Sequence, residues 1–474
     1  MTVLDTEVLV IGSGAGGATT AARLAEAGRS VLVVEEGAWV PAEATVPFSL
    51  EEMVAKYRHR GGAAALGSPA VAYAEGSCVG GSTEINSGLW HRLPDHLAED
   101  WRRTYAIDEF TAPTLERYAE EMEATIGVSS LPGPPPVSSA ILADGATKLG
   151  WESTEFPRVF RYAPDGSGVK QTMTRTMLPR ATAAGAVVQP RCRIKRLTFA
   201  GGRVTGARAV LTHDDGATET VQLRADHVFV CGGAIQSPAL LQRSGIRRGI
   251  GNGLKLHPTI KVAARFPFPV DHDDVPMHRI IEFAPYLTIG GSASRRGQVA
   301  LALAESGAPY QEALADWESV AVYYAAIRSE GSGRVIAVPG FEAPIVTYRL
   351  TPGDLSRLAR GLIHLGEALL AAGATELYPS VIDGGVVHDV QGLGQWWDAV
   401  TPARANLMTV HLTSSIRIGE NAELAGADSF GRIRNVANLR VNDASLLPEG
   451  PGVNPQAAIM TVAARNADHF LATS

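Results

Sequence analysis

Three glycines near the N-terminus have the spacing of a phosphate-binding turn. Gly12, Gly14 and Gly17 follow an apolar run and open an alanine-rich stretch, and Glu35 ends a second apolar run eighteen residues after Gly17. Such a turn presents backbone amides at the positive end of a helix to a pyrophosphate, and an acidic residue about 20 positions further accepts hydrogen bonds from ribose hydroxyls. The pattern predicts a dinucleotide site, disfavours a 2′-phosphate, and leaves FAD and NAD both open.

A histidine near the C-terminus is the second group suited to chemistry. His411 lies in MTVHLTSSIRIG, with no other charged residue before Arg417. An imidazole titrates near neutral pH and can act as a general base toward an alcohol within hydrogen-bond distance. A nearby carboxylate would raise the imidazole pKa and keep the ring protonated, so the absence of one favours a base. The alternatives are a buried histidine bonded to backbone and, as a rival base, His257, for which a structural role is favoured.

The elements that must hold these residues begin with a βαβ unit. Residues 6–37 alternate a β-branched run, the glycine turn, a helical pattern and a second β-branched run. Further on, residues 201–212 and the stretch from Ala217 have the pattern of hairpin strands. They end in a buried strand at Val228 to Cys231 that leads into a helix starting near Ser237. These patterns indicate a Rossmann-like domain.

The middle of the chain has a different pattern. From Thr259 to about Tyr348, strand-like stretches follow one another without a glycine-rich phosphate loop, which predicts a mostly antiparallel sheet. Two helical patterns accompany it, one at residues 115–127 and one at 351–374 with Thr351 as N-cap. Residues 129–139, SSLPGPPPVSS, have the composition of a linker.

Length and composition limit the class of protein. A chain of 474 residues with 45% hydrophobic residues, 19% charged residues and a net charge of -7 indicates two or three globular units and disfavours nucleic acid as a partner. Cys78, Cys192 and Cys231 lack the spacing of a zinc site or disulfide framework, which suits a reducing cytoplasm. The N-terminal apolar run is too short for a membrane span and lacks the basic region of a signal peptide.

Residues 75–92, EGSCVGGSTEINSGLWHR, form a second glycine-rich segment. A turn without side chains lets backbone lie against a flat ring system such as isoalloxazine. The segment resembles the first signature of the glucose-methanol-choline (GMC) oxidoreductases. The matching residues are Gly76, Gly80, Gly81, Ser82, Asn86, Trp90 and Arg92.

Two further blocks strengthen the resemblance. CGGAIQSPALLQRSGI resembles the second signature of the family, with a departure at Arg247, where glycine is usual. The segment from Asn438 resembles the C-terminal block. The matching residues of these two blocks are Gly233, Ala234, Ser237, Pro238, Ser244, Gly245, Asp443, Ala444, Ser445, Pro448, Asn454 and Pro455.

The resemblance implies a catalytic pair. In this family a histidine that opens the pattern His-x-x-Gly/Ser-Ser/Thr is followed about 40 residues later by His or Asn; here these are His411 and, 43 positions on, Asn454. The chain is therefore similar to the His/Asn members. Leu412 and Ser414 depart from the frequent proline and glycine. His411 is expected to take the hydroxyl proton while the Asn454 amide donates to the same oxygen. Asn454 as a mere turn residue before Pro455 is the alternative.

The resemblance also implies FAD, held noncovalently, because Ile85 occupies the place of the histidine that attaches FAD in some members. Asp443 is expected at the pyrophosphate through its backbone amide, with capping of the following turn as the alternative, and Glu35 is favoured over Glu36 at the ribose. No metal is expected. The expected cofactor-binding residues are Gly12, Ser13, Gly14, Ala15, Gly17, Glu35, Glu36, Gly76, Gly80, Gly81, Asn86, Ile194, Gly233, Asp443, Ala444, Asn454 and Pro455.

The expected fold is α/β, a Rossmann-like FAD-binding domain interleaved with a substrate domain on a mostly antiparallel sheet. The FAD domain takes residues 1–92, 181–255 and 406–474, and the substrate domain 93–180 and 256–405. The expected reaction is FAD-dependent oxidation of a primary or secondary alcohol to an aldehyde or ketone by hydride transfer to flavin N5, with oxygen, a quinone or a carrier as electron acceptor. A hydroxynitrile-lyase-like enzyme and a catalytically inactive flavin-binding protein are the alternatives.

Several other side chains carry no firm prediction. His278, Glu282, Tyr323 and Tyr324 lie on the expected substrate sheet, where strand alternation makes core or surface positions more common than pocket positions. Trp396 and Trp397 are aromatic neighbours of the kind that usually pack. The substrate region contains no motif that selects among sugar, sterol, terpenoid, aromatic and aliphatic alcohols.

Overall fold

The computed structural model describes residues 2–272 and 275–474. The βαβ unit expected at the N-terminus forms as β1 (Thr2–Ile11), α1 (Ala15–Glu26) and β2 (Val31–Val34). β1 is extended at its N-terminal end by exposed residues and becomes fully buried from Val8 to Val10, the part that pairs with β2. The glycine turn between β1 and α1 therefore lies at the carboxyl end of a central parallel strand, where open α/β sheets bind ligands.

This unit is part of a seven-stranded sheet. Its parallel strands, in spatial order, are β8 (Val187–Gln189), β2, β1, β11 (Thr218–Val230) and β22 (Leu439–Val441). The long β11 also pairs in antiparallel fashion with β10 (Arg203–Thr212), which pairs with β9 (Cys192–Ala200). Helix α1 packs against α12 (Gln456–Thr473) and α6 (Met177–Ala183). The Rossmann-like prediction is confirmed.

Helix α7 (Gly233–Arg243) begins four residues before the expected start near Ser237 and contains Pro238. Because a proline has no backbone N–H, it leaves the carbonyl of Ala234 without its intrahelical donor. The hydroxyl of Ser415 donates to that carbonyl at 2.6 Å. An interaction from a distant segment thus repairs the helix, which is why the local pattern places the start too late.

A nine-stranded sheet forms the other half of the molecule. Its strands, in spatial order, are β3 (Ala63–Ala65), β4 (Val71–Tyr73), β20 (Leu407–Thr409), β13 (Thr259–Arg265), β16 (Val320–Ile327), β15 (Leu287–Gly291), β14 (His278–Ile280) and β5 (Ser153–Glu155), with β19 (Glu376–Pro379) also paired to β13. Within this sheet, as far as residues 2–272 and 275–474 are concerned, β4 and β20 are the only parallel pair, so the prediction of a mostly antiparallel sheet is confirmed. β3, β4 and β20 come from ranges expected to belong to the FAD domain; the domain boundaries stay a prediction.

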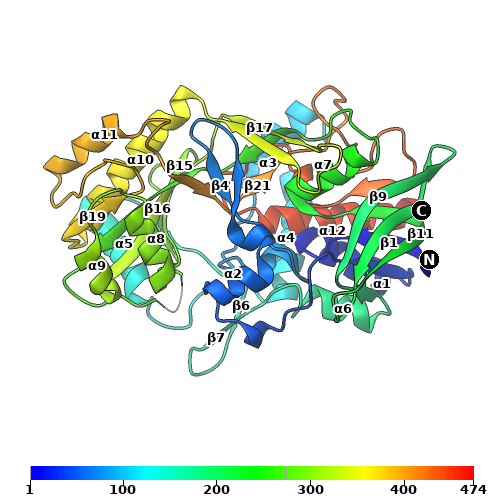
Figure 1. The fold of residues 1–474 in the computed structure, drawn as a ribbon, viewed down its shortest axis with the longest axis horizontal. Coiled ribbons are helices and arrows are strands. Elements are labelled where there is room, and N and C mark those ends of the chain that lie inside the picture. The colour runs from blue at the N-terminus through cyan, green and yellow to red at the C-terminus, as the bar shows by residue number, and fades with distance from the viewer. Residues whose placement is uncertain (1, 273–274) are drawn as a thin grey trace.

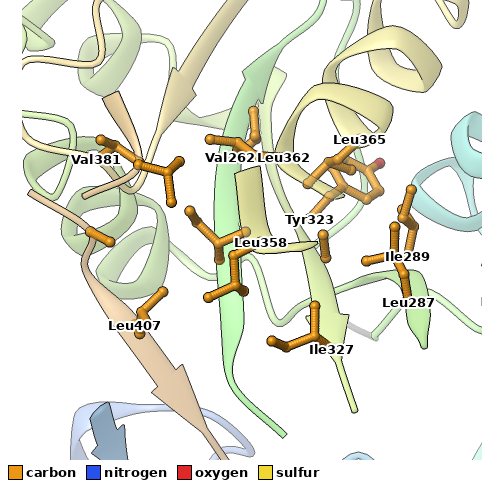
Figure 2. Close-up of a cluster of buried hydrophobic side chains, with 14 of the residues drawn as sticks. Val262, Leu287, Ile289, Tyr323, Ile327, Leu358, Leu362, Leu365, Val381 and Leu407 are labelled. Carbon is orange, nitrogen blue, oxygen red and sulfur yellow. The ribbon is translucent and has the colours of Figure 1, made fainter. Parts of the chain in front are cut away.

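Helix α10 (Pro352–Ala371) covers one face of this sheet. Thr351 caps it as predicted, with Thr351 Oγ1 accepting from the Asp354 amide at 3.0 Å and Asp354 Oδ2 accepting from the Thr351 amide at 2.9 Å. Figure 2 shows Leu358, Leu362 and Leu365 of α10 directed toward the strands. Tyr323 belongs to this core, and its hydroxyl donates to the carbonyl of Ser138 at 2.9 Å. Residues on the opposite face of the sheet line the cavity that is described below.

The remaining helices surround both sheets. They are α2 (Leu50–Lys56), α3 (Asp95–Tyr105), α4 (Ala112–Ile126), α5 (Val137–Leu149), α8 (Arg296–Ala304), α9 (Gln311–Ala315) and α11 (Gln395–Ala399). A small hairpin consists of β6 (Phe160–Tyr162) and β7 (Gly168–Lys170). In Figure 1 both termini lie with β1, β9 and β11 at one end of the molecule, α10 and α11 lie at the other, and α2 lies between.

A third, four-stranded sheet joins the two halves. Its order is β18 (Ile345–Arg349), β17 (Ser332–Ile336), β12 (Asn252–Leu256) and β21 (Leu412–Thr413). Leu256 of β12 stands opposite Leu412 of β21 in antiparallel register. The residue after one strand and the residue before the other, His257 and His411, are thereby brought together.

Candidate active site

A cavity of about 1090 Å³ lies between the two large sheets. Its wall combines the glycine turn after β1, the glycine-rich segment at residues 75–92, the start of α7, and the loops that carry His411 and Asn454. The wall also includes the face of the nine-stranded sheet opposite α10 and parts of α2 and α8. A nucleotide cradle and a second compartment lined by strands are therefore parts of one continuous space.

The three glycines of the turn have three different surroundings. A Cβ on Gly12, whose φ is +104°, would lie 2.4 Å from the carbonyl oxygen of Cys231, and one on Gly17 would lie 2.0 Å from that of Gly12. A Cβ on Gly14 would meet nothing closer than the Cα of Gly81, at 3.9 Å. Gly12 and Gly17 thus allow the turn and the close packing of α1, while Gly14 leaves bare backbone facing the cavity.

Glu35 lies at the end of β2 and closes this turn. Its Oε2 accepts from the Ser13 amide at 3.1 Å and the Ser13 hydroxyl at 2.8 Å, and its Oε1 accepts from the Gly37 amide at 3.0 Å. Burial raises the pKa of Glu35. A carboxylate keeps acceptor capacity beyond these bonds, so Glu35 remains able to accept from ribose hydroxyls.

Glu36 also lines the cavity but is directed to other partners. It forms an ion pair with Arg58 and accepts from the Ser77 hydroxyl at 3.2 Å. Burial opposes ionisation, yet the charges of Arg58 and Arg193 lower the pKa of Glu36. The acidic group that contacts the glycine turn is therefore Glu35.

The glycine-rich segment at residues 75–92 lies directly against the first turn. A Cβ on Gly81 would lie 2.9 Å from the Cα of Gly14, and one on Gly76 would lie 2.5 Å from the backbone of Gly81. Asn86 is held by protein partners, because its Nδ2 donates to Gln456 Oε1 at 2.7 Å and its Oδ1 accepts from the Gly88 amide at 3.0 Å. Two glycine-rich loops that are far apart in sequence form one surface.

Asp443 binds the start of α7 through its side chain. Its carboxylate accepts from the Gly233 amide at 2.8 Å, the Ser237 hydroxyl, the Ser445 amide at 2.8 Å and the Ser445 hydroxyl at 2.5 Å. It also caps the short helical turn Ala444–Leu446. The capping alternative is therefore observed, and a role of the Asp443 backbone amide at a pyrophosphate stays a prediction.

The structure places almost all the expected site residues on the cavity wall. The exceptions are Gly17, which packs behind the turn, and Gly80, where a Cβ would meet the carboxyl group of Glu84. The residues on the wall are His411, Asn454, Gly12, Ser13, Gly14, Ala15, Glu35, Glu36, Gly76, Gly81, Asn86, Ile194, Gly233, Asp443, Ala444 and Pro455.

His411 contacts His257, the other histidine considered as a possible base. His257 Nδ1 lies 3.0 Å from His411 Nδ1, and the His257 Nε2 accepts from the Gly452 amide at 3.0 Å. Burial, with Arg328 and Arg279 adding charge repulsion, lowers the pKa of His257 to about 3. Burial, His257 and Arg279 place the pKa of His411 well below its usual range. Both imidazoles are therefore neutral at ordinary pH.

Asn454 lies two residues after the amide that binds His257. Its Oδ1 is buried and has no hydrogen-bond partner among residues 2–272 and 275–474. An unpaired buried amide oxygen is unfavourable and usually indicates a partner that is bound in function. The two loops that carry His411 and Asn454 are thus linked through His257, with hydrogen-bonding capacity left for a ligand.

Several wall residues were missed by sequence reasoning. Thr259 and Lys261 alternate along β13, and Val322, Tyr324 and Ala326 alternate along β16, all on the cavity face. Their period of two was visible in the sequence, but nothing local indicates which face is covered by α10. Further wall residues that were missed include Arg58, Glu75, Gln236, Arg243, His272, Arg279, Thr288, Met408 and Val410.

The side chains for which the sequence made no firm prediction lie partly on the cavity wall, partly in the core and partly at the surface. Tyr324 lines the cavity and Tyr323 packs in the core, while Trp396 is buried, with its Nε1 donating to the Gly384 carbonyl at 3.1 Å. Trp397 is exposed, and Glu282 Oε2 accepts from the Glu152 amide. The three cysteines are buried free thiols.

The described residues include no candidate membrane span and no candidate metal cluster. No helix within residues 2–272 and 275–474 has the length and apolarity needed to cross a bilayer. In the same part of the chain, no group of three or more His, Cys, Asp or Glu side chains is arranged to hold a metal ion.

A Rossmann-like sheet with two glycine loops facing one large cavity is the architecture of a dinucleotide-binding protein. Family models described as GMC oxidoreductase match residues 7–259 and 337–463. The chain is 39% identical to an uncharacterized GMC-type oxidoreductase of Sinorhizobium fredii, over 99% of this chain and 95% of the relative. It is 27% identical to a long-chain-alcohol oxidase of Arabidopsis thaliana, over 97% of this chain and 66% of the relative.

Solved structures share the fold. Pyridoxine 4-oxidase from Mesorbium loti matches with a TM-score of 0.74 at 20% identity, covering 98% of this chain and 99% of that one. A formate oxidase variant of Aspergillus oryzae matches with a TM-score of 0.76 at 16% identity, covering 99% and 98%. The chain belongs to the GMC oxidoreductase family. It is a flavin-dependent oxidoreductase, and its cofactor is FAD.

Proposed function

We propose that the protein oxidises an alcohol to an aldehyde or ketone, with His411 accepting the hydroxyl proton and Asn454 hydrogen-bonding to the same oxygen. The observation that carries the proposal is His411 itself. It is an imidazole on the wall of the FAD cavity, in contact with a second neutral imidazole, and its pKa lies well below the usual range. The long-chain-alcohol oxidases among the relatives support an alcohol as the substrate.

The cofactor and the chain divide the chemistry. When bound, FAD supplies the acceptor for the hydride that leaves the carbinol carbon. The cradle for it is expected to consist of the turn at Gly12 to Ala15, Glu35 and the loop at Gly76 to Gly81. The side chains then have to bind the alcohol, orient it, and remove one proton.

The histidine pair has two possible proton arrangements. With the Gly452 amide donating to His257 Nε2, neutral His257 carries its proton on Nδ1 and donates to His411 Nδ1. Neutral His411 then carries its proton on Nε2 and can donate to an alcohol oxygen. In the other arrangement His411 Nδ1 donates to His257 Nδ1, and His411 Nε2 is free to accept the hydroxyl proton. The proposal requires the second arrangement during turnover, so His257 must release the Gly452 amide when substrate binds.

Asn454 suits an orienting role. Its amide oxygen lacks a partner among the described residues, and an amide carries two donor hydrogens besides. In the productive complex the one hydroxyl proton is directed to His411, so Asn454 contributes through its amide N–H, which donates to the hydroxyl oxygen and would stabilise a developing alkoxide. The buried amide oxygen is then available to another donor group of the ligand.

The test is anaerobic addition of a panel of alcohols to the FAD-loaded protein. Bleaching of the flavin band by primary or secondary alcohols is the expected result. Turnover without bleaching would indicate a lyase, and a loaded flavin that no alcohol reduces would indicate a binding protein; either result overturns the proposal. Reoxidation of the reduced protein by air, by a soluble quinone or by neither then identifies the class of electron acceptor.

A further inference from the structure

Arg279 is a buried cation on the wall of the cavity. It lies in the middle of β14, and only 4% of its surface is exposed. Its guanidinium makes no hydrogen bond or ion pair with any residue in the described part of the chain, and its Nε is a buried donor without a partner. Guanidinium groups stay charged in proteins, and an unpaired buried charge is strongly unfavourable. The position therefore calls for an anion that none of the residues 2–272 and 275–474 supplies.

Arg279 belongs to a short row of residues across three strands of the nine-stranded sheet. Arg279 stands opposite Gly290 of β15, and Gly290 stands opposite Tyr324 of β16. Gly290 has no side chain, and the phenol of Tyr324 lies over it, since a Cβ on Gly290 would be 2.8 Å from the Tyr324 hydroxyl oxygen. The guanidinium carbon is 5.7 Å from the ring centres of both Tyr324 and Phe156. The aromatic rings hold the guanidinium in place, but a ring face offers weak compensation for a full charge.

The next cation in the row is already neutralised. Lys261 of β13 stands opposite Tyr324, and its Nζ lies 3.0 Å and 2.9 Å from the two carboxylate oxygens of Glu305. Glu305 is thereby committed to Lys261 and does not reach Arg279. Within the described residues, Arg279 is thus the cation of this row that lacks a carboxylate partner.

Arg279 also lies close to the candidate catalytic residues. Its charge contributes to lowering the pKa of His411, and it does the same for His257 and His91. An anion bound at Arg279 would therefore lie in the same compartment as an alcohol at His411. The two positions are suited to the two ends of one molecule.

We propose, building on the alcohol oxidation above, that the substrate is a hydroxy acid whose carboxylate binds Arg279 while its carbinol reaches His411 and Asn454. A planar carboxylate matches the two-pronged guanidinium in shape, and its charge is opposite to that of Arg279. A phosphate monoester would carry nearly two charges and would need more donors than this row provides. The carboxylate takes no part in the oxidation: the carbinol loses one proton and one hydride, and the carboxylate leaves unchanged on the product.

The first experiment compares flavin reduction by paired compounds under anaerobic conditions. The pairs are ω-hydroxy acids, in a ladder of chain lengths from glycolate upward, and the neutral primary alcohols of the same length. We expect half-maximal reduction at roughly 10- to 100-fold lower concentration for the acid at the preferred chain length. The preferred length then measures the span between Arg279 and His411. Glycerol phosphate serves as the doubly charged comparison and is expected to bind more weakly than the acid.

The second experiment removes the charge. In Arg279→Gln the advantage of the acid over its paired alcohol should disappear, and Arg279→Lys should restore part of it, because lysine keeps the charge but not the fork. Arg208→Gln, the same change at an exposed position on β10, is the control and should keep the full advantage. The readout is the ratio of the concentrations of acid and of paired alcohol that give half-maximal flavin reduction. Any general effect of Arg279 on His411 alters the reaction of both substrates equally and so leaves this ratio unchanged.

A binding measurement separates this inference from the proposed function. Propionate and butyrate, which have no hydroxyl group, should perturb the absorbance of the bound flavin and compete with substrate in the wild-type protein but not in Arg279→Gln. If neutral alcohols reduce the flavin as readily as the acids and simple carboxylates do not bind, the carboxylate assignment is overturned while alcohol oxidation stands. If carboxylates bind at Arg279 but no alcohol reduces the flavin, alcohol oxidation fails and the anion site stands. Equal binding in wild type and Arg279→Gln also overturns the assignment.

Discussion

His257 Nδ1 lies 3.0 Å from His411 Nδ1, and their rings meet at 88°. The contact follows from the pairing of β12 with β21, in which Leu256 stands opposite Leu412. A strand pair of only a few residues thus places one buried histidine behind another. Because His257 is also bonded to the Gly452 amide, it connects the proton chemistry of His411 to the loop that carries Asn454.

Replacing His411 by alanine should slow reduction of the bound flavin by an alcohol by about 100-fold or more, which is the usual contribution of a positioned base. FAD content should stay unchanged. The measurement is anaerobic stopped-flow absorbance at saturating alcohol, with His96→Ala, an exposed histidine on α3, as the control. Unchanged kinetics with full FAD would remove His411 from the mechanism.

His257 should make the protein less stable in acid. In the unfolded chain this histidine has its ordinary pKa of 6.5, whereas burial lowers its pKa in the folded protein to about 3. Between those pH values the unfolded chain binds the extra proton, so the free energy of unfolding falls as the pH drops from 6.5 toward 3. His257→Phe removes this group, and urea unfolding at a series of pH values should show a shallower acid decline than wild type. Equal slopes would mean that His257 titrates normally in the folded state.

Arg279 should influence the pH below which the rate of flavin reduction falls, which is the acidic limb of the pH–rate profile. Its positive charge disfavours protonated His411, so Arg279→Gln should raise the pKa of His411. Reduction requires the neutral imidazole, and the acidic limb should therefore move to higher pH in the variant. The measurement uses a neutral alcohol, so that loss of carboxylate binding does not enter. A limb that stays in place, or moves to lower pH, would contradict the proximity of Arg279 to His411.

Gly14 and Gly17 should respond differently to the same substitution. A Cβ at Gly17 would overlap the carbonyl of Gly12, so Gly17→Ala should reduce the free energy of unfolding of the FAD-free protein by about 1–3 kcal/mol or more. A Cβ at Gly14 has room in the FAD-free protein but projects where the cofactor is expected. Gly14→Ala should therefore leave that stability within about 0.5 kcal/mol and lower FAD occupancy. Equal FAD occupancy in Gly14→Ala and wild type would move the pyrophosphate away from this turn.

FAD should leave the protein on denaturation, because Ile85 provides no side chain that can form a covalent link. Acid precipitation followed by centrifugation should leave the flavin absorbance in the supernatant. Flavin that sediments with the polypeptide would show an attachment elsewhere in the chain.

Much of the cradle is visible in local sequence because its chemistry is local. Gly12, Gly14 and Gly17 lie within six residues, and their spacing is dictated by one turn at one helix end. The strands of the βαβ unit are also indicated by their β-branched runs, and the strands of the nine-stranded sheet by a period of two, although that period does not say which face is covered. These signals need no knowledge of distant segments.

The rest of the site depends on contacts between distant segments. Pro238 favours a start of α7 near Ser237. The observed start at Gly233 is explained by the hydrogen bond from Ser415, which is far away in the sequence. His257 looked like a junction residue because nothing near it in sequence points to His411. The sequence around Arg279 does not mark it as a site residue. Its importance depends on its cross-strand neighbours, Gly290 and Tyr324, neither of which is a carboxylate, and these neighbours are known only once β14, β15 and β16 are paired.

The order of strands in the seven-stranded sheet also has a consequence for biosynthesis. β1 precedes its partner β11 by about two hundred residues, and the sheet is completed beyond β11 by β22. Helix α12, which covers α1, is the last element of the described chain. In nascent polypeptides the apolar strand at Val8 to Val10 therefore lacks its β11 partner until residues 227–229 have been translated, and α1 lacks its cover by α12 for longer. Recombinant yield should accordingly depend on translation rate and on chaperones that shield this strand.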